Sequence, residues 1–325
     1  MRIKLWGIRG SLPTPQVPEH DESKIKSLLK KYVQHVETTN DQDINAFLKT
    51  LKPYEVSGFG GNTACIEVSS AKQKLIVDGG SGIRRLGEQL VLGPCGEGIG
   101  EIHLLMTHFH WDHIVGLPFF IPLFIPGNKI HVYSVQDNAE ESFRTLFRKP
   151  NFPVPYENLG AEIIYHQLAP RKPTQFEDIT VTPYQLDHPD PCWGYKFENR
   201  GKAFSYCVDT EGVRVSRSDL GEDLPMYQNL DLMIFDAQYT FLEAAEKVDW
   251  GHSSAPIGLD IAMREGIKRV VFVHHDPAAS DLKIADAEAQ TRDYYRARLK
   301  ATEAQGKPLN EVEWEFAIEG TTIDI

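Results

Sequence analysis

The sequence predicts an α/β protein in which two β-sheets stack face to face and helices cover their outer faces. Three observations indicate this class. Strand-like apolar runs recur along the whole 325-residue chain, helical patterns flank the series, and no linker rich in Pro, Gly or Ser interrupts it. Because stacked sheets with outer helices bury one continuous core, we predict a single domain over residues 1–325.

Strands are predicted where short apolar or alternating runs end in turn-forming residues, since successive side chains of a strand point to opposite faces. In chain order these runs are Arg2–Trp6, Ala64–Ser69, Lys74–Asp78, Glu101–Thr107, Lys129–Val135, Glu162–Leu168, Ile179–Leu186, Gly194–Glu198, Ala203–Val208, Asp231–Phe235, Arg269–His274 and Glu313–Ile318.

Helices are predicted where apolar residues recur with the spacing of one helix face. In chain order these segments are Ile25–Val36, Ile44–Leu51, Ala139–Arg148, Phe241–Val248, Ala255–Glu265 and Ala285–Ala304.

The first two predicted helices belong to a highly charged insert, residues 16–56, that separates the first strand from the second. Their apolar stripes cannot be left in water, so we expect the pair to pack against the rim of a site or against a partner subunit. Plain packing at the edge of the fold, a lid and a homodimer interface remain open. The stripes consist of Ile25, Leu28, Leu29, Tyr32, Val33 and Val36, and of Ile44, Phe47, Leu48 and Leu51.

The composition is typical of a soluble globular protein, with 41% hydrophobic and 25% charged residues. The formal net charge of −12 repels polyanions, so we expect no stable binding of nucleic acid. A small anionic substrate, met by local Lys or Arg side chains at the mouth of a site, is compatible with this charge. No apolar run approaches the length of a membrane span, so no membrane association is expected.

Two features favour a cytoplasmic location. Residues 1–7 alternate like a strand and lack the apolar core of a signal peptide. The cysteines are spread out without a Cys-x-x-Cys pair, which is typical of free, buried thiols in a reducing compartment. They are Cys65, Cys95, Cys192 and Cys207.

The stretch Thr107–His113 is the most informative part of the chain, because three histidines and an aspartate follow an apolar run within six residues. Imidazole nitrogens and carboxylate oxygens are the donors that hold zinc and similar divalent ions. His108 and His110, two apart on an extended turn, can face one ion. Asp112 and His113 are offset enough to reach a second. A chance cluster in a polar loop is the alternative, and the scarcity of histidine disfavours it.

A site for two metals needs about six or seven protein donors, so the remaining donors should also lie at strand ends. Three residues fit. His188 follows one predicted strand, Asp209 closes the strand that ends at Val208, and His274 closes another. Each alone would more often be a capping or surface residue, but together with the first motif they are predicted metal ligands.

This order of residues resembles the metallo-β-lactamase superfamily, whose mark is the His-x-His-x-Asp-His motif followed by a histidine, an aspartate and a final histidine. The resemblance runs from Trp6–Ser11 to His274 and covers most of the chain outside the insert. It implies a four-layered αββα sandwich, the metallo-β-lactamase fold, with the metals at the edge of the two sheets. The helical insert near the N-terminus is an addition to that fold.

The resemblance also implies how the ligands are shared between two divalent ions. Zinc is the first choice for a site rich in imidazole, with manganese or iron as alternatives. One ion is expected on His108, His110 and His188, the other on Asp112, His113 and His274, with Asp209 between them.

Several segments are similar to the phosphodiesterase and ribonuclease Z-like branch, among them Gly60–Cys65 and Asp78–Gly80. Trp250–Ala255 resembles the Gly-His-Ser-Thr-Ala segment of ribonuclease Z-like enzymes. Phe235–Tyr239 resembles their His-Glu-Ala-Thr-Phe segment, with Asp in place of Glu and Phe in place of His. By this resemblance His252 would donate a proton to the leaving alkoxide or hold a phosphoryl oxygen, and Asp236 would orient its ring. A simple helix N-cap at this segment remains open.

Other departures from the family pattern narrow the function. Trp111 is bulky where many members carry a small residue, so it narrows the pocket or stacks on a base. No long Gly/Pro-rich arm of the ribonuclease Z type is present in the sequence, which argues against RNA processing. His110 stands where the di-iron flavoprotein branch has Glu, which argues against that branch.

The remaining polar residues near the motifs are interpreted mainly as structural. Asp78 is predicted to lie behind the metals at the turn after a buried strand, rather than in a phosphate-binding nest. Arg9, Arg84 and Arg85 are predicted to be ordinary structural or solvated arginines rather than phosphate contacts. His275 either lines the site or packs against the final helix.

The sequence therefore predicts a dinuclear phosphodiesterase that cleaves a small diester, a cyclic nucleotide being one candidate, with a metal-activated hydroxide. Asp112, Asp236 and His252 are the residues expected to act in catalysis. The alternative is a thioester, lactone or β-lactam hydrolase on the same metals. A non-catalytic metal-binding scaffold is disfavoured because every expected ligand is present.

Overall fold

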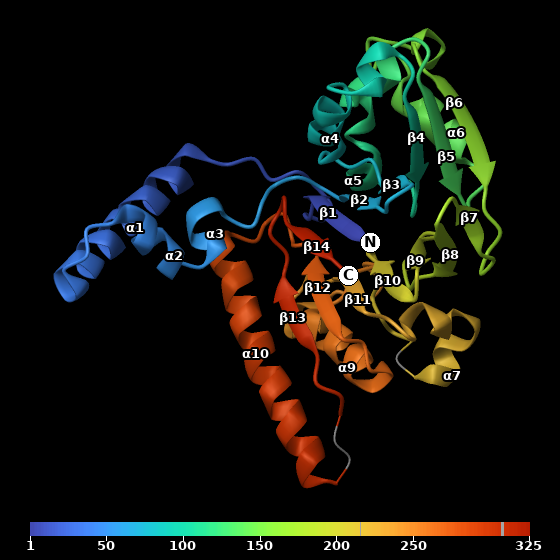
Figure 1. Cartoon of the computed structure of the whole chain (residues 1–325). Helices are drawn as coiled ribbons and strands as arrows, with labels where there is room; N and C mark the ends of the chain where they lie inside the picture. The colour runs from blue at the N-terminus through green and yellow to red at the C-terminus, as the bar shows by residue number, and fades with distance from the viewer. Residues whose placement is uncertain (215, 307–308) are drawn as a thin grey trace.

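Two stacked sheets form the centre of the computed structural model of this chain (Figure 1). The structure describes residues 1–214, 216–306 and 309–325. The first sheet has the strand order β14-β1-β2-β3-β4-β5-β6, and the second has the order β13-β12-β11-β10-β9-β8-β7. Helices flank both sheets. The predicted α/β class and its layers are confirmed.

Apart from β7 and β14, which match no predicted run, the strands agree with the predicted runs to within a few residues at each end. The first sheet consists of β1 (Arg2–Gly7), β2 (Cys65–Ser69), β3 (Lys74–Val77), β4 (Glu101–Leu105), β5 (Lys129–Ser134), β6 (Glu162–Gln167) and β14 (Thr322–Asp324). The second consists of β7 (Thr174–Phe176), β8 (Ile179–Gln185), β9 (Trp193–Asn199), β10 (Lys202–Cys207), β11 (Leu232–Asp236), β12 (Arg269–Val273) and β13 (Glu313–Phe316).

Helices connect the strands and cover the sheets. They are α1 (Pro18–Thr39), α2 (Ile44–Thr50), α3 (Pro53–Ser57), α4 (Ile83–Leu90), α5 (Trp111–Ile114), α6 (Ala139–Leu146), α7 (Arg217–Leu220), α8 (Phe241–Glu246), α9 (Ala255–Glu265) and α10 (Asp281–Ala304). Short 3-10 turns lie at Pro94–Glu97, Leu117–Phe119, Ile121–Phe124, Tyr156–Asn158 and Gly221–Tyr227.

The main core lies between the two sheets and is built by alternate residues of their strands. Ile66 and Val68 of β2 belong to it, together with Phe204 of β10 and Ile234 of β11. Residues whose side chains point to the other face of the first sheet, such as Ile76 of β3, belong to a second apolar cluster. This cluster includes residues of α4 and α6. Burial on both faces fixes the first sheet rigidly, so the residues that follow its strands are held in place.

Elements that the sequence did not reveal are short or depend on distant partners. No helix is predicted from the sequence at the position of α4, and β7 is only 3 residues long. β14 exists because it pairs with β1, with Asp324 opposite Arg2. The two chain ends consequently lie side by side, and the Met1 amine donates to the Ile325 carbonyl at 3.0 Å (Figure 1).

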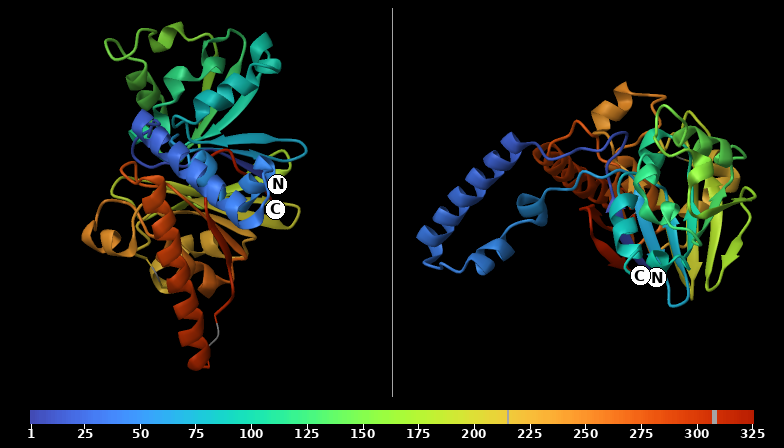
Figure 2. Two further views of the ribbon diagram at one scale, coloured as in Figure 1. Left: turned by 90° about the vertical axis from the view of Figure 1, so that its left-hand side faces the viewer. Right: turned by 90° about the horizontal axis from the view of Figure 1, so that it is seen from above.

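The predicted insert forms three helices, α1 to α3, that extend sideways from the sandwich as an arm (residues 18–57; Figure 2). Phe47 of α2 is buried, and its ring centroid lies 5.3 Å from that of Tyr32 on α1. α1 itself has no buried residue. Ile25, Leu29 and Val33 of α1 are exposed. Ile44 and Leu48 of α2 are exposed as well, so the expectation that both apolar stripes are covered is wrong for α1 and holds in α2 only for Phe47. The sandwich cannot cover this face because the arm projects away from it.

The structure also bears on two further predictions, the state of the cysteines and membrane spanning. All four cysteines are free and buried, as predicted. In the part of the chain that the structure describes, no helix is both long enough and apolar enough to cross a membrane.

Candidate metal centre

The predicted donors gather at one edge of the sandwich because several strands end there. β10, β11 and β12 are parallel, and β9 runs antiparallel to both β8 and β10, so the carboxyl ends of β8, β10, β11 and β12 share one edge of the second sheet. His188, Asp209 and His274 follow three of these strands. The loop after β4 brings His108 and the rest of the first motif from the other sheet.

Three residues of this edge have backbone conformations that the sequence did not predict. Asp78, Asp209 and His274 each follow a strand and have positive φ values of 62°, 63° and 66°. Residues other than glycine rarely adopt this left-handed conformation, and it persists only where the surrounding structure enforces it. Here it turns the chain sharply at the end of the strand and leaves the side chain among the other donors.

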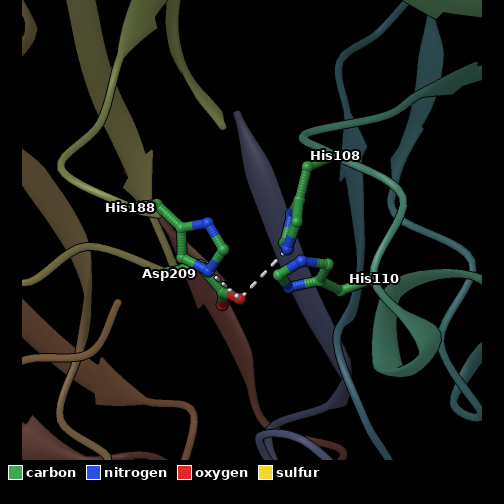
Figure 3. Close-up of side chains that lie close together, drawn as sticks. All are labelled: His108, His110, His188 and Asp209. Atoms are coloured by element: carbon green, nitrogen blue, oxygen red, sulfur yellow. Dashed lines mark ion pairs between the residues drawn. The ribbon is translucent and has the colours of Figure 1, made fainter. Parts of the chain in front are cut away.

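One group of donors consists of His108, His110, His188 and Asp209, with one possible ligand atom from each lying within 4.8 Å of the others (Figure 3). His108 Nε2 is 3.3 Å from Asp209 Oδ2, and His188 Nε2 is 3.8 Å from the same oxygen. The ring centroids of His110 and His188 are 4.8 Å apart. The structure therefore brings together the residues predicted for the first ion.

The second group consists of Asp112, His113, Asp209 and His274, again within 4.8 Å. His274 Nε2 is 3.0 Å and His113 Nε2 is 3.3 Å from Asp209 Oδ1. Asp112 Oδ2 lies 3.4 Å from His113 Nε2 and 3.5 Å from His274 Nε2. Asp209 thus directs one carboxylate oxygen at each group, which is the arrangement expected of a bridging ligand.

The donor set fits divalent metal ions by its unsatisfied atoms. Nε2 of His108, His113 and His274 and Oδ1 of Asp209 are all buried, and none has a hydrogen-bond partner. Buried polar atoms are normally hydrogen-bonded because an unpaired one is costly. Four such atoms converging on one small volume indicate that a bound ion completes their coordination.

The charges around the site also favour a bound metal ion. Burial, and then the neighbouring His113, lower the pKa of His108 to about 3, so its ring is the neutral form that binds metals. Burial opposes protonation of His113 too, but Asp209, Asp112 and Asp78 raise its pKa well above the usual value. Burial also opposes ionisation of Asp209, yet His274 and His113 lower its pKa well below the usual value. The buried carboxylates therefore require positive charge next to them.

A surrounding layer orients the donors. Asp78 Oδ2 lies 2.8 Å from Nδ1 of His113, and Asp78 accepts hydrogen bonds from both the amide and the hydroxyl of Thr107. Such contacts leave Nε2 of the ring free for a metal. The Ser11 amide donates to Asp112 Oδ2 at 2.8 Å. The prediction that Asp78 lies behind the metal donors, outside a phosphate nest, agrees with these contacts.

Asp236 and His252, which were predicted from resemblance alone, are in contact beside the second group. Asp236 Oδ2 lies 3.0 Å from His252 Nδ1, and the His252 ring stacks on His274 with centroids 4.9 Å apart. Burial disfavours the charged ring, but the Asp236 carboxylate outweighs burial and raises the pKa of His252 to about 9. The Ser254 side chain makes no cap hydrogen bond at the start of α9, so the alternative of a simple helix N-cap has no side-chain bond at Ser254 to support it.

The remaining residues have structural surroundings. Arg9 is buried and donates to the carbonyls of Gly60 and Ala279, so it ties loops together instead of facing solvent. His275 is buried against the rings of Phe59 and Phe316. It therefore packs on β13, not on the final helix as one of its two readings expected. Trp111 is exposed, so it does not narrow a buried pocket.

Asp190 is a site residue that sequence reasoning missed. Its Oδ2 lies 2.8 Å from Nε2 of His110, and its carbonyl lies 3.1 Å from Nδ1 of His188. The hydrogen bond from His110 lowers the pKa of this carboxyl below the usual value. Its place two residues after His188 was the available signal, but an aspartate between two prolines also suits an ordinary turn.

Comparisons with known proteins identify the class. Residues 74–275 match the family described as Beta-lactamase superfamily domain, and the chain belongs to this superfamily. The ribonuclease Z of Staphylococcus carnosus is 26% identical over 203 residues, covering 58% of this chain and 56% of that protein. The chain spans about half the length of the first curated relatives that it matches. The predicted resemblance to the ribonuclease Z-like branch is confirmed.

Solved structures show the same fold. The short form of human tRNase Z and unliganded yeast PDE1 each superpose with a TM-score of 0.60 at 16% sequence identity. Each match covers 100% of this chain and 99% of the other. The chain therefore has the metallo-β-lactamase fold, with a cluster of His and Asp residues that could hold metal ions.

Proposed function

We propose that this protein hydrolyses a small phosphodiester, using two divalent metal ions of which zinc is the first choice. The observation that carries the proposal is the Asp236–His252 pair, whose histidine ring stacks on His274 next to the donor groups. A carbonyl hydrolase has less need of an added acid at this position. A cyclic nucleotide is one substrate that fits, and the net charge of −12 argues against long polyanions.

The donors would hold the two ions in the predicted way, with His108, His110 and His188 on one and Asp112, His113 and His274 on the other. Asp209 supports this by directing Oδ2 at the first group and Oδ1 at the second. When bound, such ions activate a water nucleophile and neutralise the phosphoryl oxygens. The convergence of all these donors also argues against a non-catalytic scaffold.

The chain's own contribution is to place a proton near the leaving oxygen. The Asp236 carboxylate accepts a hydrogen bond from Nδ1 of the protonated His252, so Nε2 carries the second proton. The Asp236 carboxylate favours the protonated ring and raises the pKa of His252 to about 9. Bound cations oppose this charge, so the Asp236 carboxylate is what maintains it. His252 then acts as the general acid that protonates the departing alkoxide.

The test compares leaving groups. His252→Ala should reduce turnover of an alkyl or nucleoside diester by about 10²- to 10⁴-fold, because those leaving groups need a proton. A p-nitrophenyl leaving group needs little protonation, so its hydrolysis should fall far less. Metal content, measured by elemental analysis, should not change. His20→Ala, an exposed histidine on α1, serves as the matched control.

Two outcomes would contradict the proposal. Equal losses on both substrates would remove the acid role of His252. No diesterase activity in the metal-loaded wild type, with turnover of a thioester or lactone instead, would favour the carbonyl hydrolase.

A further inference from the structure

Two of the chain's tryptophans are strongly exposed, although large apolar side chains are usually buried. Trp111 is 69% exposed and Trp250 is 62% exposed, whereas Trp6 and Trp193 are buried. Scattered apolar residues at a surface need no explanation, but two indole rings at one site do. Both lie beside the candidate metal centre.

Trp111 and Trp250 are each the chain neighbour of a residue that contacts His188. Trp111 directly follows His110, whose ring centroid is 4.8 Å from that of His188. Trp250 directly precedes Gly251, which has a φ of 84° and lies so close to His188 that an added Cβ would be 2.3 Å from the ring. Each tryptophan is therefore bonded to a residue in contact with His188, and both side chains are exposed to solvent.

A cation and a second, buried ring lie next to Trp250. The Lys247 ammonium lies 4.1 Å from the ring centroid of Tyr239 and 5.7 Å over the Trp250 ring. The Tyr239 ring is 5.8 Å from that of His252. Contacts thus run from the exposed Trp250 through Lys247 and the buried Tyr239 to the proposed general acid. An exposed indole ring with an ammonium group beside it suits a ligand that combines a flat ring with negative charge.

We infer that Trp111 and Trp250 form a subsite that stacks a planar aromatic group on the non-leaving side of the phosphodiester. The inference rests on the proposed function and deepens it by naming a substrate class, an aromatic diester. Stacking is tolerant of ring identity because every aromatic ring has a π-face. A nucleobase and a simple aryl group are two sources of that chemistry.

The experiment uses the metal-loaded protein and three diesters with the same leaving group. Thymidine 5′-(p-nitrophenyl) phosphate, phenyl p-nitrophenyl phosphate and methyl p-nitrophenyl phosphate differ only on the non-leaving side. Wild type should have a higher kcat/KM for the two aromatic diesters than for the methyl diester. Trp111→Ala and Trp250→Ala should each lower the aromatic-to-methyl ratio of kcat/KM by about 5- to 150-fold, the range measured for base stacking.

Conservative and distant variants control the result. Trp250→Phe keeps a ring and should restore most of the ratio. Leu92→Ala, an exposed apolar side chain on a different part of the surface, should leave the ratio unchanged. A larger loss with the thymidine diester than with the phenyl diester supports a nucleobase, and equal losses support any aryl group. A ratio that the tryptophan substitutions do not move overturns the subsite.

A binding measurement separates this inference from the proposed function. Tryptophan fluorescence of the metal-loaded protein is titrated with thymidine 5′-monophosphate and with methyl phosphate, which need no turnover. Quenching by the nucleotide alone, weakened about 5- to 150-fold in apparent affinity by Trp250→Ala, supports the subsite even if no diester is hydrolysed. Identical titrations with both ligands overturn it, even if diesterase activity is present.

Discussion

Asp209 is the residue on which the candidate metal centre depends most. It is buried, its φ is positive, and its two carboxylate oxygens face different histidine groups. Neither group is complete without it. A carboxylate in this position also compensates the charge of two neighbouring dications, which histidines cannot do.

We therefore predict that Asp209→Ala loses most of its bound metal, because both groups lose a shared anionic ligand. Elemental analysis after gel filtration measures the metal per chain. Asp137→Ala, at an exposed acid that belongs to neither donor group, is the control. Unchanged metal content in Asp209→Ala would sink the ligand assignment.

Asp223 lies in the 3-10 turn Gly221–Tyr227 and supports, through Arg214, the loop that carries His188. It accepts hydrogen bonds from Arg171 at 2.8 Å and from Arg214 at 2.7 Å. Arg214 also pairs with Asp187, the residue before His188. Burial alone would raise the pKa of Asp223, but the two guanidinium groups outweigh it and the pKa is lowered.

The sign of the resulting pH dependence follows from the lowered pKa. An unfolded aspartate titrates near 3.9, so the pairing stabilises the fold fully above that value. The stabilisation is lost as the pH falls from there through the lower folded pKa. Asp223→Asn should lower Tm by several degrees at pH 7, and the gap to wild type should narrow below about pH 4. Thermal denaturation followed by circular dichroism measures both, and a gap independent of pH would contradict the assignment.

At the scale of elements, the arm formed by α1 to α3 is the part whose role the sandwich does not explain. Its contacts with the rest of the fold are few, and one of them joins the Lys24 ammonium to Asp281 at 3.7 Å. Ile25, Leu29 and Val33 form an exposed apolar stripe on an ordered helix. An exposed stripe of this kind favours an interface between chains over simple packing at an edge.

We predict that the protein is a homodimer whose interface includes this stripe. Leu29→Lys should shift the mass measured by light scattering toward that of one chain, because a charge in the interface would be buried unpaired. Leu92→Lys introduces the same charge at an exposed leucine outside the arm and should leave the mass unchanged. A wild type that is already monomeric at micromolar concentration would show that the stripe has another role.

At the scale of the whole molecule, the metal centre joins the two sheets at one edge. The first motif follows β4 of one sheet, and the later donors follow strands of the other. Asp78, Asp112, Asp209 and Asp236 are all buried near this edge in a chain of net charge −12. Bound cations should consequently stabilise the fold as well as supply chemistry.

Metal removal tests this link. A chelator should lower Tm, and added zinc should restore it, because a ligand that binds only the folded state stabilises it. The effect is about 4 kcal/mol when free metal exceeds its Kd about 1,000-fold. Differential scanning calorimetry measures the shift. Asp209→Ala should respond much less to the chelator, and an equal response in both proteins would mean that the metal acts elsewhere.

The sequence by itself determined the features that depend on local pattern. Strand periodicity predicted the two-sheet fold, since alternation along a strand depends only on which face is buried. The burst of donors from His108 to His113 marked a metal site because the chemistry of imidazole and carboxylate is intrinsic to those residues. The later donors and the Asp236–His252 pair were found by their places after strands and by family resemblance.

Only the tertiary structure decided the features that arise between distant segments. The division of Asp209's two oxygens between two groups, the pairing of β14 with β1, and the contact of Asp190 with His110 each join residues far apart in the chain. Helical spacing predicted the apolar stripe of α1, yet periodicity cannot say whether a neighbour covers it. Spatial packing decides that, and in this molecule it leaves Leu29 and Trp250 exposed.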